Sequence, residues 1–195
     1  DVLAEQAVAA LAAAVGHLFD TQADALAELA ARNVEAAVYL GSGGGIGAAH
    51  EAALKMVEMT GGKVITMAET FLGLRHGPMS SIRPGTLIVG FLSPDPAVRS
   101  YELDLLRELD RKQLGLAKLM VGEGIPADVL RPGDVAIELA GLGHHGELPS
   151  LLAGVAVGQL LAFFRCLHLG DRPDTPSQGV LTRVVQSFTL HGNGA

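Results

Sequence analysis

"AAVYLGSGGGIGAAHEAALKMVEMTGGKVITMAE" (residues 36–69) is the stretch that decides the fold. A short apolar run leads into clustered glycines, then a helical pattern, then a second apolar run. This order predicts a parallel β-α-β unit. In such a unit the backbone N–H groups of the glycine turn and of the first helical residues point toward an anion. Ser42, Gly43 and Gly44 are therefore candidate substrate contacts. The anion of a dinucleotide and that of a sugar phosphate fit equally well, and a tight turn without a ligand is a third alternative.

The alternation of strands and helices continues through the chain. Five strands with intervening helices predict a three-layer, doubly wound α/β fold with a parallel sheet in the order 2-1-3-4-5, which binds ligands at the carboxyl ends of its strands. We expect one domain, with N-terminal helices at 1–33, an α/β core at 34–170 and a C-terminal segment at 171–195. The expected strands are 36–42, 63–69, 86–93, 116–124 and 134–139, and the expected helices are two within 2–32, separated by a break and cap near Asp20, then 43–62, 95–112 and 149–169.

Composition limits the classes of function. The 195 residues suit a single core, and 49% of them are hydrophobic against 18% charged, which is typical of a globular chain. A net charge of -7 disfavours a nucleic-acid partner, because such proteins concentrate Lys and Arg on one face. The single cysteine, Cys166, excludes an intramolecular disulfide. No uninterrupted run of 18 apolar residues and no signal peptide is present, so we expect a cytoplasmic protein without a membrane segment.

The glycine turn also fits a dinucleotide site in part. Gly43, Gly45 and Ala48 have the spacing of a dinucleotide fingerprint. The related short-chain dehydrogenase chemistry needs a tyrosine followed four residues later by a lysine, and neither Tyr39 nor Tyr101 has one. An NAD-dependent oxidoreductase therefore has only the glycines in its favour.

Two groups of side chains after the turn are more informative. Glu51, Lys55 and Glu58 lie at i, i+4 and i+7, which places them on one helix face, where the Glu51–Lys55 pair fits a surface ion pair. The stretch "GLRHGP" follows the second strand and holds Arg75 and His76 in a short loop fixed by Gly and Pro. Such a loop is suited to presenting a basic side chain, and Arg75 is a further candidate substrate contact.

These motifs, together with "LIVGFLSPDP" and the terminal "LTRVVQSFTLH", resemble the C-terminal half of proteins with two sugar isomerase (SIS) domains. They are most similar to the tagatose-6-phosphate ketose/aldose isomerase family, close to the galactosamine-6-phosphate deaminase/isomerases. They are more distantly similar to the isomerase domain of glucosamine-6-phosphate synthase. The resemblance covers nearly the whole chain and implies a flavodoxin-like SIS fold.

The resemblance also implies roles for individual residues. Glu58 corresponds to the base that moves a proton between C1 and C2 of the open-chain sugar, and Lys55 to its partner or to a stabiliser of the enediolate. His76 corresponds to a residue that assists ring opening, in relatives often across a dimer interface. Arg183 is the nearest C-terminal cation for a phosphate, with a surface arginine as the alternative. Gln186 stands where the synthase has a lysine, so Schiff-base chemistry of that type is not expected.

One departure from the family pattern concerns the phosphate. The loop after the third strand reads "LSPDPAVRS", with Asp95 and two prolines where hydroxyl groups would be wanted, so the chain is expected to hold the base without a phosphate anchor. His144 and His145 are adjacent and have no further ligand spacing, so neither a metal nor a cofactor is expected. The sequence predicts a phosphosugar aldose/ketose isomerase or aminosugar-phosphate deaminase, acting on a sugar phosphate as a homodimer or paired with another SIS half. A non-catalytic phosphosugar-binding module is the alternative.

Overall fold

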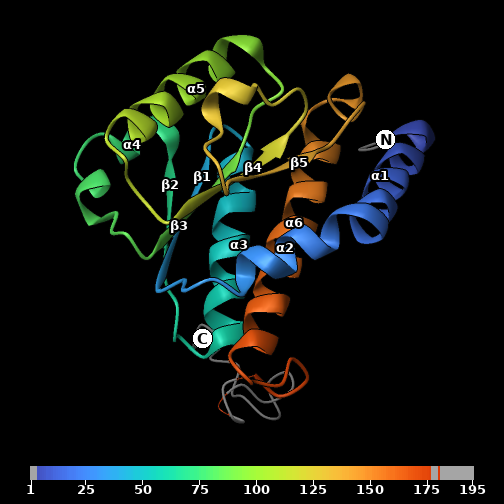
Figure 1. Cartoon of the computed structure of the whole chain (residues 1–195). Coiled ribbons are helices and arrows are strands. Elements are labelled where there is room, and N and C mark those ends of the chain that lie inside the picture. The colour runs from blue at the N-terminus through green and yellow to red at the C-terminus, as the bar shows by residue number, and fades with distance from the viewer. Residues whose placement is uncertain (1–3, 177–179, 181–195) are drawn as a thin grey trace, which may run out of the picture.

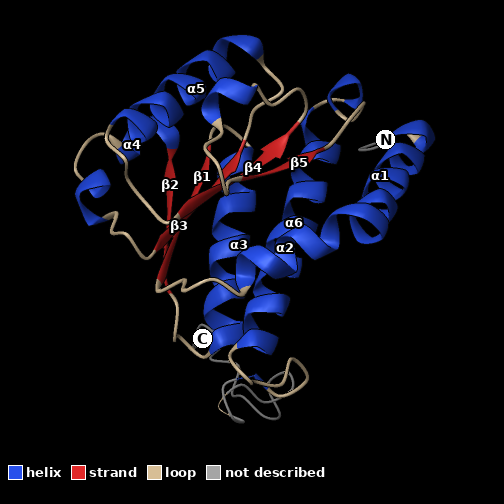
Figure 2. Ribbon diagram, viewed as in Figure 1, coloured by secondary structure: helices blue, strands red, loops and turns tan. Residues whose placement is uncertain are grey.

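The computed structural model describes residues 4–176 and 180. Five parallel strands form one sheet in the order β2-β1-β3-β4-β5, which confirms the predicted order and class. Helices cover both faces of the sheet (Figures 1 and 2). The strands are β1 (Ala36–Gly41), β2 (Ile65–Thr70), β3 (Thr86–Phe91), β4 (Ala117–Gly122) and β5 (Val135–Glu138). The α-helices are α1 (Glu5–His17), α2 (Ala23–Ala30), α3 (Gly45–Thr60), α4 (Phe71–Leu74), α5 (Pro96–Arg111) and α6 (Glu147–His168). The shorter turns are η1 (Leu18–Gln22), which is π-helical, and the 3₁₀ turns η2 (Pro78–Ser81), η3 (Ala127–Val129) and η4 (Gly143–His145).

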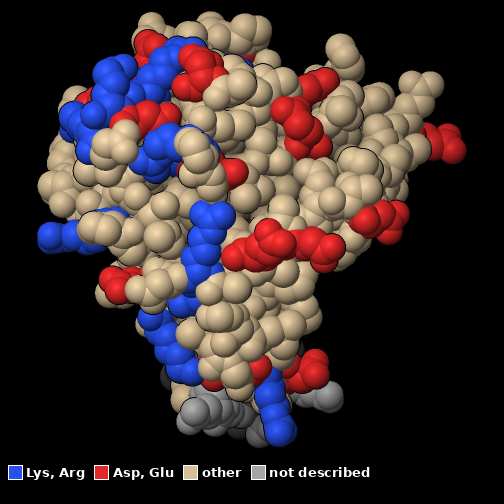
Figure 3. Space-filling model, in the orientation of Figure 1, with Lys and Arg blue, Asp and Glu red and all other residues tan. Residues whose placement is uncertain are grey.

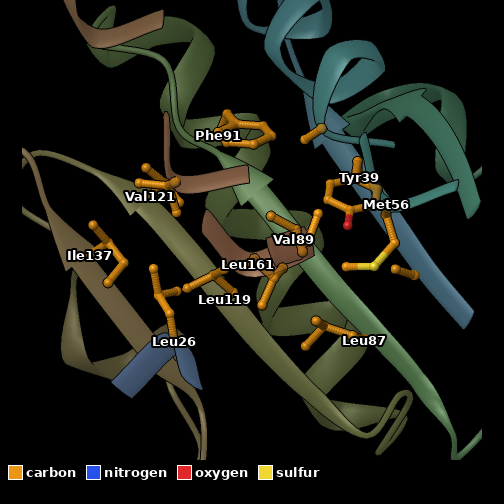
Figure 4. Packing of buried hydrophobic residues seen from close by; sticks show 14 of the residues in the cluster. Leu26, Tyr39, Met56, Leu87, Val89, Phe91, Leu119, Val121, Ile137 and Leu161 are labelled. Carbon is orange, nitrogen blue, oxygen red and sulfur yellow. The ribbon is translucent and has the colours of Figure 1, made fainter. Parts of the chain in front are cut away.

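The sheet divides the core into two layers because successive residues of a strand point to opposite faces. On the face that we call the α3 face, side chains of β1, β3, β4 and β5 pack against α2, α3 and α6. Figure 4 shows this layer, with Tyr39, Val89 and Leu119 from the strands and Met56 and Leu161 from the helices. On the opposite face, called the α5 face, the intervening strand residues pack against α4 and α5.

The contact between α3 and α6 is close because small residues line it. A methyl group added at Gly158 of α6 would lie 2.4 Å from the Cβ atom of Ala52 in α3, so no side chain fits between the two helices at that point. By length and composition alone α6 is apolar enough to cross a membrane. In this structure it packs on α3, and its buried residues belong to the core of the α3 face.

The predicted break near Asp20 corresponds to η1, which separates α1 from α2, but the predicted cap is wrong. The chain stays helical through η1, and neither α1 nor α2 has a side-chain cap at its N-terminus. The Thr21 hydroxyl donates to the His17 carbonyl (2.8 Å), a bond that is compatible with a helix. A polar stretch that looks like a linker is therefore accommodated as a wider helical turn.

Candidate functional site

The helix that follows the glycine turn carries a chain of three charges. The Nζ atom of Lys55 lies 2.6 Å from Oε2 of Glu58 and 3.6 Å from Oε1 of Glu51, which confirms the expected ion pair and adds the second one. The hydrogen bond to Glu58 is the main cause that raises the pKa of Lys55, so the ammonium group stays charged. About a third of each side chain is exposed (30–34%). The Lys55–Glu58 pair is therefore accessible to a ligand, and in water such pairs contribute little to stability.

The loop that holds His76 is fixed by its backbone. The Thr70 hydroxyl caps α4 by accepting the Gly73 N–H (2.9 Å), and the His76 N–H donates to the Gly73 carbonyl (3.0 Å). Gly77 has φ +133°, a conformation that side chains rarely adopt, so glycine is required after the histidine. As a result the imidazole of His76 is exposed.

Arg75 lies in the same loop but points to a protein partner. Its Nε atom donates to Oε2 of Glu108 in α5 (2.8 Å), and Lys112 binds the other oxygen of the same carboxylate (2.6 Å). Figure 3 shows basic and acidic side chains interleaved over α4 and α5. A substrate that uses Arg75 would have to compete with Glu108.

Glu58 and His76 lie in different layers of the molecule. Glu58 is in the last turn of α3, on the α3 face, whereas the loop of His76 follows α4, whose Phe71 and Leu74 pack on the α5 face. The sheet separates the two layers (Figure 1). A single chain does not bring this carboxylate and this imidazole together.

The glycine turn binds a carboxylate of the chain itself. The Gly44 N–H donates to Oε1 of Glu147 at the start of α6 (2.9 Å), while the next N–H groups bond within the turn. A methyl group at Gly41 would lie 2.2 Å from the carbonyl oxygen of Gly45, so the chain must be glycine there. In the structure the anion beside this turn is the Glu147 side chain, whereas the prediction concerned the phosphate of a ligand.

The turn and the charged chain on α3 are separate places. Glu58 comes fourteen positions after Gly44, which corresponds to about 21 Å along a helix. Ser42, Gly43 and Gly44 therefore do not contact a hexose phosphate that is held at Glu58 of the same chain. Their role in binding substrate stays a prediction.

The loop after β3 also has its N–H groups occupied. Asp95 caps α5 by accepting the N–H groups of Ala97 (2.8 Å) and Val98 (3.3 Å). These are the groups that a phosphate would use at a helix N-terminus. The expected lack of a phosphate anchor in this loop stays a prediction, and the occupied N–H groups support it.

Sequence reasoning missed two carboxylates at this end of the sheet, Glu147 and Glu102. Glu102 in α5 is fully buried, and its Oε2 atom accepts the N–H of Ser93 (2.9 Å). A glutamate in the second turn of a polar helix carries no sequence signal of burial, and Glu147 is 103 residues from the glycine that it binds. Their contacts come from tertiary packing.

Two pairs of residues from the sequence analysis remain, the C-terminal pair Arg183 and Gln186 and the histidine pair of η4. Arg183 and Gln186 lie outside the described residues. His144 and His145 are in η4, and within residues 4–176 and 180 no three His, Cys, Asp or Glu side chains gather in a way that could hold a metal ion.

Comparisons with known proteins give the same fold. No family model matches the chain. It is 39% identical over 155 residues to the D-galactosamine-6-phosphate deaminase AgaS of Escherichia coli O157:H7, a match that covers 79% of this chain and 40% of the relative. It superposes on tagatose-6-phosphate ketose/aldose isomerase from Escherichia coli with a TM-score of 0.75 at 31% identity, over 91% of this chain and 47% of that one. The chain has the fold of a sugar isomerase (SIS) domain.

This SIS domain spans about two fifths of the length of the deaminase and about half of the isomerase. The C-terminal domain of glucosamine-fructose-6-phosphate aminotransferase from Francisella tularensis has the same fold, with a TM-score of 0.67 at 23% identity. The resemblance to SIS proteins that the sequence motifs indicated is confirmed. The SIS domain accordingly corresponds in size to one half of its longer relatives.

Proposed function

We propose that this SIS domain is the base-bearing part of a phosphosugar aldose/ketose isomerase or an aminosugar-phosphate deaminase. The observation that carries the proposal is the Lys55–Glu58 pair, which is partly exposed on α3 with its two charged atoms 2.6 Å apart. The names of the relatives support this class of substrate, since one is a galactosamine-6-phosphate deaminase and another a tagatose-6-phosphate isomerase.

The chemistry requires a base near C1 and C2 of the open-chain sugar. The Glu58 carboxylate takes the proton from one carbon and returns it to the other, with an enediol between the two steps. The Lys55 ammonium stabilises the negative charge that develops on the sugar oxygens, because it is held beside the carboxylate and remains charged. In a deaminase the same proton transfer precedes loss of the amine as ammonia.

His76 acts in this proposal from outside the chain that supplies Glu58. Its imidazole is exposed and lies on the other side of the sheet, so a second copy, or another SIS half, must bring it to the sugar. We therefore propose pairing as part of the function, in the cytoplasm, with the phosphate bound away from the loop that Asp95 closes.

The alternative, a module that binds phosphosugars without turnover, is not favoured by relatives that are named as enzymes. An NAD site at the glycine turn loses its main support, because the Gly44 N–H faces Glu147.

The experiment follows proton exchange in the full natural chain. With tagatose-6-phosphate or galactosamine-6-phosphate in deuterated water, NMR should show deuterium at C1 and C2, and a coupled assay would detect ammonia from the amino sugar. Glu58→Gln should slow exchange by about 100-fold or more, since general-base catalysis contributes that much.

Glu51→Gln is the matched control, because it removes a carboxylate from the same helix face and the same lysine. It should leave exchange near the wild-type rate. Substrate binding without exchange in the wild type would identify a sensor instead, and equal losses in both variants would contradict the role of Glu58.

A further inference from the structure

A depression with a volume of about 420 Å³ lies at the carboxyl ends of the first strands, apart from the Lys55–Glu58 pair. Its walls come from the end of β1, the start of α4 and the first turns of α5. Leu72 and Tyr101 stand at its rim with 45% and 59% of their surface exposed. The lining residues are Ser42, Thr70, Phe71, Leu72, Ala97, Val98, Tyr101 and Glu102. The depression is therefore mostly apolar, with a few polar groups.

Glu102 is the unusual member of this lining. Its side chain is completely buried, and within the described part of the chain its Oε1 atom has no hydrogen-bond partner. The Ser42 hydroxyl is close enough to the carboxyl to favour its charged form, yet the Oε1 atom is left without a hydrogen bond. Buried polar atoms without a partner are rare, because leaving one unsatisfied is unfavourable.

The surroundings of this carboxyl disfavour an anion. The lining contains no Lys or Arg, and Asp95 already accepts the N–H groups of Ala97 and Val98 at the start of α5. Arg99 acts on this carboxyl from outside the lining, and it directs its guanidinium to the backbone carbonyls of Ser93 and Glu123. The group that fits Oε1 is a hydrogen-bond donor, and a positively charged donor also compensates the carboxylate charge.

We propose that this depression binds a small ligand that carries a primary ammonium group on an apolar body. The ammonium donates to Oε1 of Glu102 and to the Ser42 hydroxyl, and the apolar body packs between Leu72, Val98 and the ring of Tyr101. An aromatic face beside a carboxylate suits an organic cation. Because Oε1 is buried, the proposed binding requires the exposed side chains of Leu72 and Tyr101 to turn aside.

The test uses three probes of one shape and different charge: benzylamine, benzyl alcohol and benzoate. Each is titrated into the full chain labelled with ¹⁵N. Benzylamine should bind most tightly and shift the amide signals of Ser42, Ser93 and Tyr101, benzyl alcohol should bind more weakly, and benzoate should not bind. The proposal is overturned if benzoate binds as well as benzylamine, or if benzylamine shifts signals elsewhere only.

Glu102→Gln keeps the shape of the side chain and removes its charge. It should weaken benzylamine binding by about tenfold or more, as expected for a lost charged hydrogen bond, and change benzyl alcohol binding little. Asp104→Asn is the control, because it removes one negative charge from an exposed position of the same helix (63% exposed). Equal weakening in both variants would mean that only the overall charge matters, and would overturn the proposal.

If Glu102→Gln does not fold, Ser42→Ala serves as the second variant, and unchanged benzylamine affinity in that variant would count against the site. The test reads binding and not turnover. Its failure would therefore leave the proposal for Glu58 standing, and failure of the exchange experiment would leave this one standing.

Discussion

Two carboxyl groups at the same edge of the sheet, Glu102 and Glu123, have pKa values that are shifted in opposite directions. Burial raises the pKa of Glu102, against smaller effects of Ser42, Ser93 and Arg99. The N–H groups of Gly141 and Gly143 lower the pKa of Glu123, mainly that of Gly141. The folded protein therefore favours the protonated form of Glu102 and the ionised form of Glu123.

These directions predict how two variants differ from the wild type with pH. A raised pKa means that the folded state loses stability as pH rises from the ordinary glutamate value through the folded pKa. Glu102→Gln avoids this loss, so the free energy of unfolding of the variant should rise relative to that of the wild type as pH increases above the ordinary glutamate value. Urea unfolding at several pH values measures the difference.

Glu123→Gln is the internal contrast. A lowered pKa gives stability that is present above the ordinary glutamate value and is lost as pH falls through the folded pKa. This variant should therefore be less stable than the wild type at neutral pH, with the gap closing in acid. Gaps that change in the same direction for both variants would contradict the assignment of Glu102 as the carboxyl destabilised by burial.

At the scale of elements, the close contact of α3 and α6 makes a packing prediction. Gly158→Ala places a methyl group 2.4 Å from the Cβ atom of Ala52, so the helices must move apart. Overpacking of this kind costs about 1–3 kcal/mol, partly offset by the better helix propensity of alanine. We expect a net loss in the free energy of unfolding, measured with urea.

Gly16→Ala in α1 separates the two effects. Nothing lies within 4 Å of a methyl group at this position, so only the propensity term acts and the variant should gain up to about 1 kcal/mol. The double variant Gly158→Ala/Ala52→Gly should recover much of the loss. If Gly158→Ala stabilises the protein as much as Gly16→Ala, the helices are not in tight contact.

The elements themselves were largely predictable, because local patterns determine them. The continuous apolar runs of β1, β3 and β4, which are buried on both faces, and the apolar face of α3 are visible in the sequence. The chain order of parallel strands with helical crossovers then gives the sheet. The turn η1 was not predictable, since a π-helical turn and a linker of the same composition have the same local pattern. Lys118 in β4 is another case. It lies in an apolar strand, fully buried, and its 2.6 Å ion pair with Asp134 needs a partner from a distant loop.

At the scale of the whole molecule, the separation of Glu58 and His76 predicts complementation between copies. Glu58→Gln and His76→Asn should each be inactive alone. When the two full-length variants are unfolded together and refolded as mixed dimers, one of the two sites in each mixed dimer has both native residues. For a two-fold dimer we expect about a quarter of the wild-type activity.

Proton exchange at C1 and C2, measured before and after mixing, tests this expectation. Refolding each variant alone is the control for recovery by handling. A mixture that stays inactive, while size-exclusion chromatography and mass spectrometry show mixed dimers, would mean that the two residues do not serve one site across an interface.

The sequence identifies the candidate residues of the site but does not show that Glu58 and His76 are separated. Motifs mark Glu58, Lys55 and His76 because their neighbours in the chain are distinctive, yet motifs say nothing about which of these residues meet. The structure adds that the glycine turn and Glu58 are about 21 Å apart along α3. Glu102 became a candidate only through its burial and its unsatisfied oxygen, which depend on Ser42 and Ser93 from other elements.

The hydrogen bond from the Gly44 N–H to the Glu147 carboxylate affects which ligands this turn can bind. Because it is attached to the same chain, it is present at a high effective concentration, and any free phosphate would have to displace a tethered competitor. Shortening or neutralising that one side chain would vacate the position without altering the backbone around it. A single substitution at Glu147 would thus convert a turn that binds a carboxylate of its own chain into one whose N–H group is available to an anion from solution.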